Sequence, residues 1–223
     1  MGGEVEYVSH PLIKPGTVEL RSYQQNIARS CLKGNTLVIL PTGLGKTVIA
    51  LLVVADRLLS LPNSRNLIVA PTRPLVLQHF EYFRSVLKLE EDDLALWTGE
   101  VPPEKRGLGS ARIVFATPQV LQNDIVSGKL SLKEFGLLVV DEAHRTVGNY
   151  AYVFLVERYA SQAENPLVLG LTASTGSEES KIQEVAKNIR ASLRSPASSA
   201  SKPRPRKARS FSGARGCHFR RSR

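Results

Sequence analysis

Short aliphatic runs alternate with longer segments along most of the chain, and Gly, Pro or polar residues bound each run. Six runs have the length and composition of buried strands: 37–40, 66–70, 94–97, 112–116, 135–140 and 167–171. The segments between them are long enough for helices, as in the unbroken aliphatic stretch 48–54. This alternation predicts an α/β fold with a mostly parallel sheet and helices on both faces.

The composition divides the chain into three parts. Residues 1–20 contain Pro11, Pro15 and Gly16 and predict an extended lead-in. Residues 21–190 hold the strand and helix patterns and form the predicted domain. From residue 191 to 223 the chain is rich in Ser, Pro, Arg and Lys, with too few apolar residues to offset the entropy of ordering. We expect this tail to be disordered.

The whole net charge of +10 comes from the tail, because residues 191–223 carry ten Lys or Arg and no Asp or Glu. The other 190 residues keep 20 of the 30 basic side chains against all 20 acidic ones. Nucleic-acid binding by the folded part must therefore depend on local groups. The tail itself has two interpretations: a nonspecific polyanion-binding arm, or a stretch without selected function, such as the product of a shifted reading frame.

Cysteine content and the amino-terminal residues bear on the compartment. The chain has two cysteines, Cys31 and Cys217, too few for a metal cluster or a disulfide scaffold. No run of 18 apolar residues is present, and the acidic start lacks a hydrophobic signal core. These features predict a soluble, intracellular, cytoplasmic protein without a membrane partner.

A phosphate-binding motif follows the first predicted strand. Its residues are Thr42-Gly43-Leu44-Gly45-Lys46-Thr47. Gly43 and Gly45 let backbone N–H groups approach an anion, and the following helix N-terminus favours negative charge. Lys46 is expected to reach the β and γ phosphates of ATP, and Thr47 to offer its hydroxyl to Mg²⁺. The strict form of this motif has Gly where Leu40 stands, but that change removes no phosphate-contacting group.

Gln24 lies in a predicted helix shortly before this motif. Its side-chain amide can donate and accept at once, which suits the N6/N7 edge of adenine. A solvated Gln on an exposed helix face is the alternative.

A second polar motif, Asp141-Glu142-Ala143-His144, follows the fifth predicted strand. Hydrolysis of ATP needs positioned phosphates, a metal ion and a group that deprotonates water. Asp141 is the expected Mg²⁺ partner and Glu142 the expected general base, with a solvated acidic turn as the alternative. We expect His144 to hydrogen-bond toward Thr172 and Ser174 and so to couple the nucleotide site to a nucleic-acid face. Every motif follows its strand, which predicts that all lie at the carboxyl edge of the sheet.

Three motifs resemble, in order and separation, motifs I, II and III of superfamily-2 DEAD/DEAH-type helicases: Gly43-Leu44-Gly45-Lys46-Thr47, Asp141-Glu142-Ala143-His144 and, after the sixth predicted strand, Thr172-Ala173-Ser174. Pro71-Thr72-Arg73 resembles motif Ia and Thr117-Pro118 resembles motif Ib. The amino-acid sequences of the motifs are similar to those of the archaeal Hef and eukaryotic FANCM branch of this superfamily, which remodels branched DNA. The resemblance covers residues 7–190.

The resemblance implies a RecA-like P-loop NTPase domain that binds ATP and Mg²⁺ and grips one nucleic-acid strand by its backbone. It further implies that Thr72, Arg73, Gly99 and Thr117 face the phosphates of DNA, through contacts that do not discriminate sequence.

Nothing after Ser174 resembles motifs IV to VI, so the sequence predicts a helicase half without the second RecA-like domain and its arginine fingers. Slow hydrolysis at best is expected, unless a separate polypeptide supplies that domain. Two alternatives stay open: a noncatalytic, nucleotide-dependent nucleic-acid-binding module, and a fragment of an RNA helicase.

Overall fold

The computed structural model describes residues 5–148, 150–173, 179–189 and 192–194. The strands are β1 (Thr36–Ile39), β2 (Arg65–Val69), β3 (Leu94–Trp97), β4 (Ile113–Ala116), β5 (Phe135–Val140), β6 (Val168–Thr172) and β7 (Ser192–Arg194). The α-helices are α1 (Ser22–Cys31), α2 (Lys46–Ser60), α3 (Arg73–Val86), α4 (Pro118–Val126), α5 (Tyr150–Gln162) and α6 (Glu179–Asn188). Short 3₁₀ helices cover Glu91–Asp93, Pro103–Lys105 and Ala143–Thr146.

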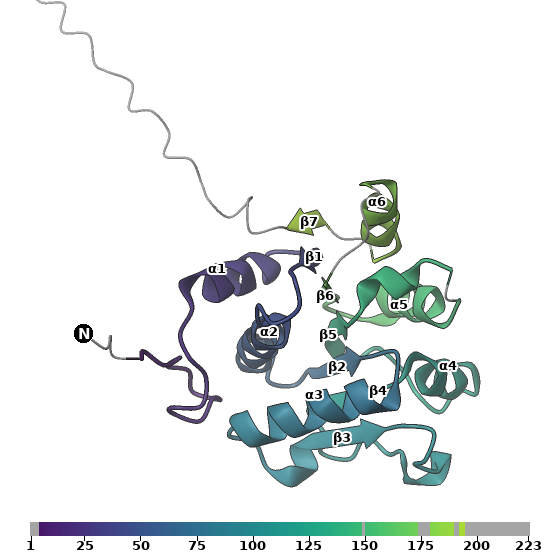
Figure 1. Cartoon of the computed structure of the whole chain (residues 1–223). Coiled ribbons are helices and arrows are strands. Elements are labelled where there is room, and N and C mark those ends of the chain that lie inside the picture. The colour runs from purple at the N-terminus through teal and green to yellow at the C-terminus, as the bar shows by residue number, and fades with distance from the viewer. Residues whose placement is uncertain (1–4, 149, 174–178, 190–191, 195–223) are drawn as a thin grey trace, which may run out of the picture.

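The strands form one seven-stranded sheet in the order β3-β4-β2-β5-β6-β1-β7, and each pairing in it is parallel. Helices α1, α2 and α3 cover one face and α4, α5 and α6 the other (Figure 1). The six predicted strands correspond to β1 to β6, so the predicted α/β architecture is confirmed.

The sheet has a hydrophobic core on each face, and alternate residues of a strand belong to one core and then the other. Val38 and Ile68 belong to the core beneath α1 to α3, whereas their neighbours Leu37 and Leu67 belong to the core beneath α4 to α6. Because successive side chains of a strand point to opposite faces, a strand buried on both sides needs a continuous apolar run. The runs in the sequence have this form.

Both ends of the predicted domain make contacts that the sequence patterns did not indicate. Residues 5–20, part of the predicted extended lead-in, pack on the domain: Val8, Ile13 and Val18 are buried in the α1–α3 core, and Ile13 forms an antiparallel bridge with Leu87. At the other end, β7 lies beyond the predicted boundary at residue 190 and pairs with the free edge of β1. Three residues pairing through the backbone leave no hydrophobic signature in the sequence. The rest of the predicted tail, 195–223, lies outside the described residues.

The strand register places the polar motifs along one edge. Ile39 pairs with Thr172, and Val69 pairs with both Val140 and Ala116. The carboxyl ends of β2, β4 and β5 are therefore level, and β6 and β1 run two residues further, because Val140 pairs with Gly170. The loops that follow these strands meet at the edge where open α/β sheets bind ligands. Within the described residues, no helix is long and apolar enough to cross a bilayer.

Candidate functional site

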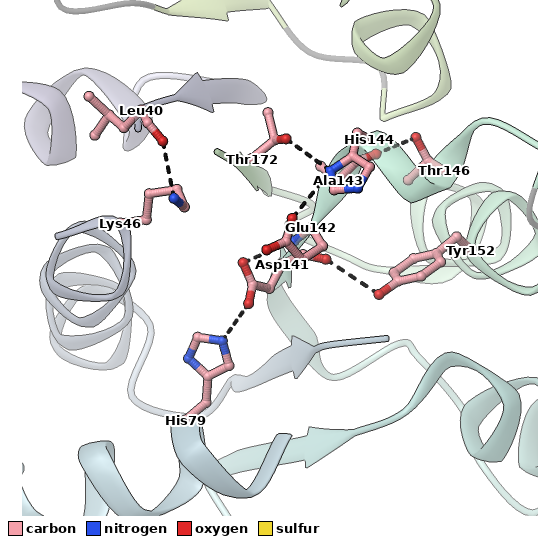
Figure 2. Close-up of polar contacts among 10 residues, drawn as sticks. All are labelled: Leu40, Lys46, His79, Asp141, Glu142, Ala143, His144, Thr146, Tyr152 and Thr172. Carbon is pink, nitrogen blue, oxygen red and sulfur yellow. Dashed lines mark hydrogen bonds and ion pairs between the residues drawn. The ribbon is translucent and has the colours of Figure 1, made fainter. Parts of the chain in front are cut away.

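The phosphate-binding loop begins at Leu40 and turns into α2 through two glycines with left-handed backbone, Gly43 at φ 84° and Gly45 at φ 79°. Gly45 is also the N-cap of α2, so Lys46 opens the helix. Lys46 Nζ donates a hydrogen bond of 3.0 Å to the Leu40 carbonyl (Figure 2). Thr42, Gly43 and Leu44 are exposed, while Thr47 is half-buried. The loop is therefore exposed at residues 42–44, and the Lys46 ammonium group is turned back onto the start of the loop.

Gln24 and Tyr23 of α1 hold this loop from the side. Gln24 Nε2 and Tyr23 Oη both donate to the Leu44 carbonyl, at 3.2 and 2.9 Å. Gln24 is 3 % exposed, so the alternative of a solvated surface Gln does not apply. A Cβ at Gly45 would lie 2.1 Å from Gln24 Nε2, which shows how closely the amide approaches the loop.

A cavity of about 280 Å³ opens between the loop, α1 and the amino-terminal segment. It is lined by Gln24, Gly43 and Gly45 on the loop side and by Thr17, Val18, Glu19, Arg21, Val48 and Tyr82 around it. The cavity thus joins the predicted adenine-binding residue to the predicted phosphate-binding backbone.

Asp141 follows β5 and is fixed from several sides. Its backbone N–H donates to the Val69 carbonyl at 2.8 Å, and Tyr152 Oη donates to its carbonyl at 3.3 Å. Burial raises the pKa of the Tyr152 phenol, with the nearby Asp141 adding to the effect, so this hydroxyl stays a donor. The carboxylate accepts the Glu142 N–H at Oδ1, 2.9 Å away, and lies 2.7 Å from His79 Nε2 at Oδ2 (Figure 2).

Glu142 has left-handed backbone at φ 51°, which is unusual for a residue other than Gly, Asn or Asp. Such backbone marks functional turns when the surroundings hold it in place. Its carboxylate Oε2 lies 3.2 Å from His144 Nδ1, and the same nitrogen lies 3.1 Å from Thr172 Oγ1. The expected contact between His144 and Thr172 is therefore present. Ser174 lies outside the described residues.

The donor set fits magnesium. Mg²⁺ takes oxygen ligands, usually one or two from the protein with water and substrate phosphates completing the octahedron. The Thr47 hydroxyl and the Asp141 carboxylate, at the carboxyl edge of the sheet, are of this kind. The described residues contain no group of three or more His, Cys, Asp or Glu that could hold a metal ion.

The predicted nucleic-acid residues lie along the same edge, beyond β2, β3 and β4. Thr72 and Thr117 are the N-caps of α3 and α4, and neither uses its side chain to cap its helix. Gly99 is exposed. Arg73 already has a partner, because its guanidinium lies 2.6 Å from the Glu100 carboxylate. Both side chains are about half exposed, so a polyanion can compete for the guanidinium.

Four residues that contact the site were not predicted from the sequence: Tyr23, His79, Glu100 and Tyr152. Each acts through a contact made in three dimensions, although Tyr23 and Glu100 stand directly beside the predicted Gln24 and Gly99 in the sequence. For His79 a signal exists, since it is a polar residue in the apolar stripe of α3, between Val76 and Phe83.

Comparison with known proteins agrees with this geometry. A family model described as DEAD/DEAH box helicase matches residues 21–182. A putative ATP-dependent RNA helicase of Methanocaldococcus jannaschii is 45% identical over 185 residues, covering 82% of this chain and 23% of that protein. The ATP-dependent DNA helicase mph1 of Neurospora crassa is 40% identical over 172 residues, covering 76% and 15%.

Among solved structures, the Hef helicase domain of Pyrococcus furiosus superposes with a TM-score of 0.74 at 47% identity. The match covers 79% of this chain and 38% of that one. The chain thus spans less than a quarter of the length of these two relatives and about two fifths of the solved helicase domain.

Proposed function

Because the chain belongs to the DEAD/DEAH box helicase family, we propose that it is the ATP- and Mg²⁺-binding first RecA-like domain of a helicase or translocase acting on branched DNA. The observation that carries this proposal is the alignment of two strand ends. Lys46 follows β1 and Asp141-Glu142 follows β5, and the register sets both at the carboxyl edge of one parallel sheet.

In this proposal, Lys46 leaves the Leu40 carbonyl and pairs with the β and γ phosphates, while N–H groups from Gly43 to Thr47 hold the phosphate oxygens. Thr47 and Asp141 would hold the magnesium ion, Asp141 through water. Bound magnesium neutralises charge that develops on the phosphates. Glu142 would orient the attacking water and accept its proton.

The cavity beside Gln24 supports adenine as the base. Gln24 lines the same cavity as the loop glycines. Its Nε2 donates to the Leu44 carbonyl and to Tyr23 Oη, so Oε1 is the atom that would accept the N6 hydrogen of adenine. Pairing with N7 as well would need Nε2 to give up one of these two contacts. His144, hydrogen-bonded to Thr172, would relay the state of this site toward the nucleic-acid face.

For the nucleic acid we propose DNA, held by its backbone through Thr72, Arg73, Gly99 and Thr117. Helix N-termini and hydroxyls are suited to phosphate oxygens and do not discriminate sequence. The relatives above carry both DNA and RNA helicase names, so RNA is the competing substrate.

The whole reaction needs more than this domain. In the helicase family the other half of the ATP cleft, with its arginine fingers, comes from a second RecA-like domain. Such fingers accelerate related phosphoryl transfers by about 10³–10⁵. We therefore propose that this chain by itself binds nucleotide well, hydrolyses it slowly and does not unwind DNA.

Binding of a fluorescent ATP analogue, with and without Mg²⁺, tests the nucleotide site. We expect magnesium-dependent binding that Lys46→Ala abolishes and that Lys33→Ala, which removes an exposed lysine away from the loop, preserves. Binding that ignores Lys46 would contradict the proposal.

ATP turnover with forked DNA separates the two functional classes. Turnover stimulated by DNA and lost in Glu142→Gln supports an enzyme. Absent turnover, together with ATP-dependent strand binding, supports a noncatalytic module, which is the second candidate because the chain matches only part of its relatives. Competition between DNA and RNA oligonucleotides decides the substrate.

A further inference from the structure

His79 lies in the middle of α3, on the face that packs against the sheet. The buried residues of this helix are Val76, His79, Phe83 and Val86, which recur at helical spacing. His79 is 6 % exposed. A polar side chain at such a position loses its contact with water, so its presence there calls for a partner.

That partner is the carboxylate of Asp141. His79 Nε2 lies 2.7 Å from Asp141 Oδ2, and the two side chains are 7 % and 10 % exposed (Figure 2). A hydrogen bond this short to a carboxylate is of the strong, charge-assisted kind. The other oxygen, Oδ1, accepts from the backbone of the adjacent Glu142.

This contact indicates which nitrogen of the His79 ring carries the hydrogen. His79 Nδ1 is buried and has no hydrogen-bond partner among the described residues, so the tautomer with hydrogen on Nε2 satisfies the pair. Asp141 then accepts two hydrogen bonds, while a carboxylate has about four lone-pair sites. Two sites therefore stay available for a magnesium ion or its water ligands.

We propose that His79 is a positioning residue for the magnesium site. The backbone of Asp141 is fixed by β2 and Tyr152, but these contacts leave the side-chain torsions free. The hydrogen bond from His79 restrains Oδ2 and so orients the carboxylate before the metal arrives. Donors behind a metal-binding carboxylate commonly change metal affinity about 10–100-fold when removed. The inference rests on the proposed function, since it concerns the same nucleotide site.

A purely structural role for His79 makes a different prediction. A core-filling residue contributes to stability through volume, and an apolar side chain of similar size would replace it without changing the magnesium requirement. A positioning residue instead acts through its N–H donor, so another side chain with a donor at the same reach should replace it. Magnesium affinity and stability thus separate the two roles.

The experiment measures the Mg²⁺ concentration that gives half-maximal binding of a fluorescent ATP analogue by the full chain. The variants are His79→Leu, which keeps bulk without a donor; His79→Gln, which carries an amide donor; and His79→Asn, whose amide is one methylene shorter. Val76→Ala is the control, since it leaves a cavity one turn away on the same buried face. Thermal unfolding without nucleotide follows the stability of each.

We expect the Mg²⁺ midpoint to rise about tenfold in His79→Leu and in His79→Asn. His79→Gln should stay within about threefold of the original chain, and Val76→Ala should keep the midpoint while losing stability. A midpoint in His79→Leu equal to that of the original chain overturns the inference. Should His79→Leu fail to fold, equal midpoints in His79→Gln and His79→Asn overturn it.

The same titration separates this inference from the proposed function. If the original chain binds the analogue without any dependence on magnesium, or does not bind it, the proposed nucleotide site is wrong and the inference falls with it. If the original chain shows the dependence and His79→Leu shares its midpoint, only the inference falls.

Discussion

Gly45 shows how one backbone position serves several parts of the site. It has positive φ, it caps α2, and it lies against the Gln24 amide. A side chain here meets two obstacles, backbone strain and a clash with a buried group, whereas at Gly43 it meets strain alone. The two glycines look alike in the sequence and differ in three dimensions.

We predict that Gly45→Ala destabilises the domain by about 2–4 kcal/mol and Gly43→Ala by about 1 kcal/mol. The Cβ at position 45 would lie 2.1 Å from Gln24 Nε2, while that at position 43 would have no heavy atom within 4 Å. Denaturant unfolding of the two variants measures the difference. Equal losses would mean that the contact with Gln24 carries no constraint.

Tyr159 offers a residue-scale test of pH dependence. Its hydroxyl donates to the Leu167 carbonyl and accepts the Leu167 N–H, and burial raises its pKa to about 12. Because the folded state disfavours the phenolate, this contribution to stability is complete below the unfolded pKa of about 10. It is lost as the pH rises from there through 12.

Tyr159→Phe should therefore lower stability near pH 8 by about 1–2 kcal/mol, because the buried Leu167 N–H loses its partner, while the Leu167 carbonyl keeps its hydrogen bond from the Leu138 N–H. The variant should also lose less stability between pH 9 and pH 11 than the original chain. Denaturant unfolding across this range checks both effects. Parallel curves for the two proteins would show that Tyr159 does not titrate in this way.

At the scale of elements, a buried ion pair fastens the segment between β3 and β4. Arg106 and Asp124 lie 3.2 Å apart, and each side chain is 7 % exposed. Asp124 belongs to α4, whose N-cap is Thr117, and Arg106 follows the segment that holds Gly99. The pair thus connects two elements that carry proposed nucleic-acid contacts.

Removing one partner of this pair should cost about 3–5 kcal/mol, because the other charge stays buried without compensation. We therefore expect Arg106→Met and Asp124→Leu each to unfold at much lower denaturant. Their combination should recover most of the loss, since an apolar pair replaces the ionic one. A double variant whose loss equals the sum of the single losses would refute coupling between the two charges.

Prediction from the sequence succeeded where a signal is local. Aliphatic runs with flanking glycines located β1 to β6. The motifs after β1 and β5 could be predicted because they directly follow, in the sequence, the strands that position them. It missed β7, which joins the domain through backbone pairing, and the packing of residues 5–20, which join it through scattered side chains such as Val8. His79 escaped for a related reason: its partner Asp141 is 62 residues away along the chain.

At the scale of the whole molecule, charge separates the described domain from the residues after β7. Residues 195–223 carry nine of the 30 Lys and Arg residues and none of the 20 acidic ones. If this segment binds nucleic acid, it does so through phosphate neutralisation, which releases counterions and makes affinity fall steeply with salt. The expected slope is about −0.7 per neutralised phosphate of a single strand.

We predict that deletion of residues 195–223, which keeps β7, weakens binding to single-stranded DNA and makes the slope of log K against log salt shallower by about 2–4. Fluorescence anisotropy over a range of salt concentrations measures both quantities. Magnesium-dependent nucleotide binding serves as the control and should be retained, because Lys46, Asp141 and their neighbours are untouched. An unchanged affinity and slope would favour the interpretation that this segment has no selected function, and DNA binding would then depend on the sheet edge alone.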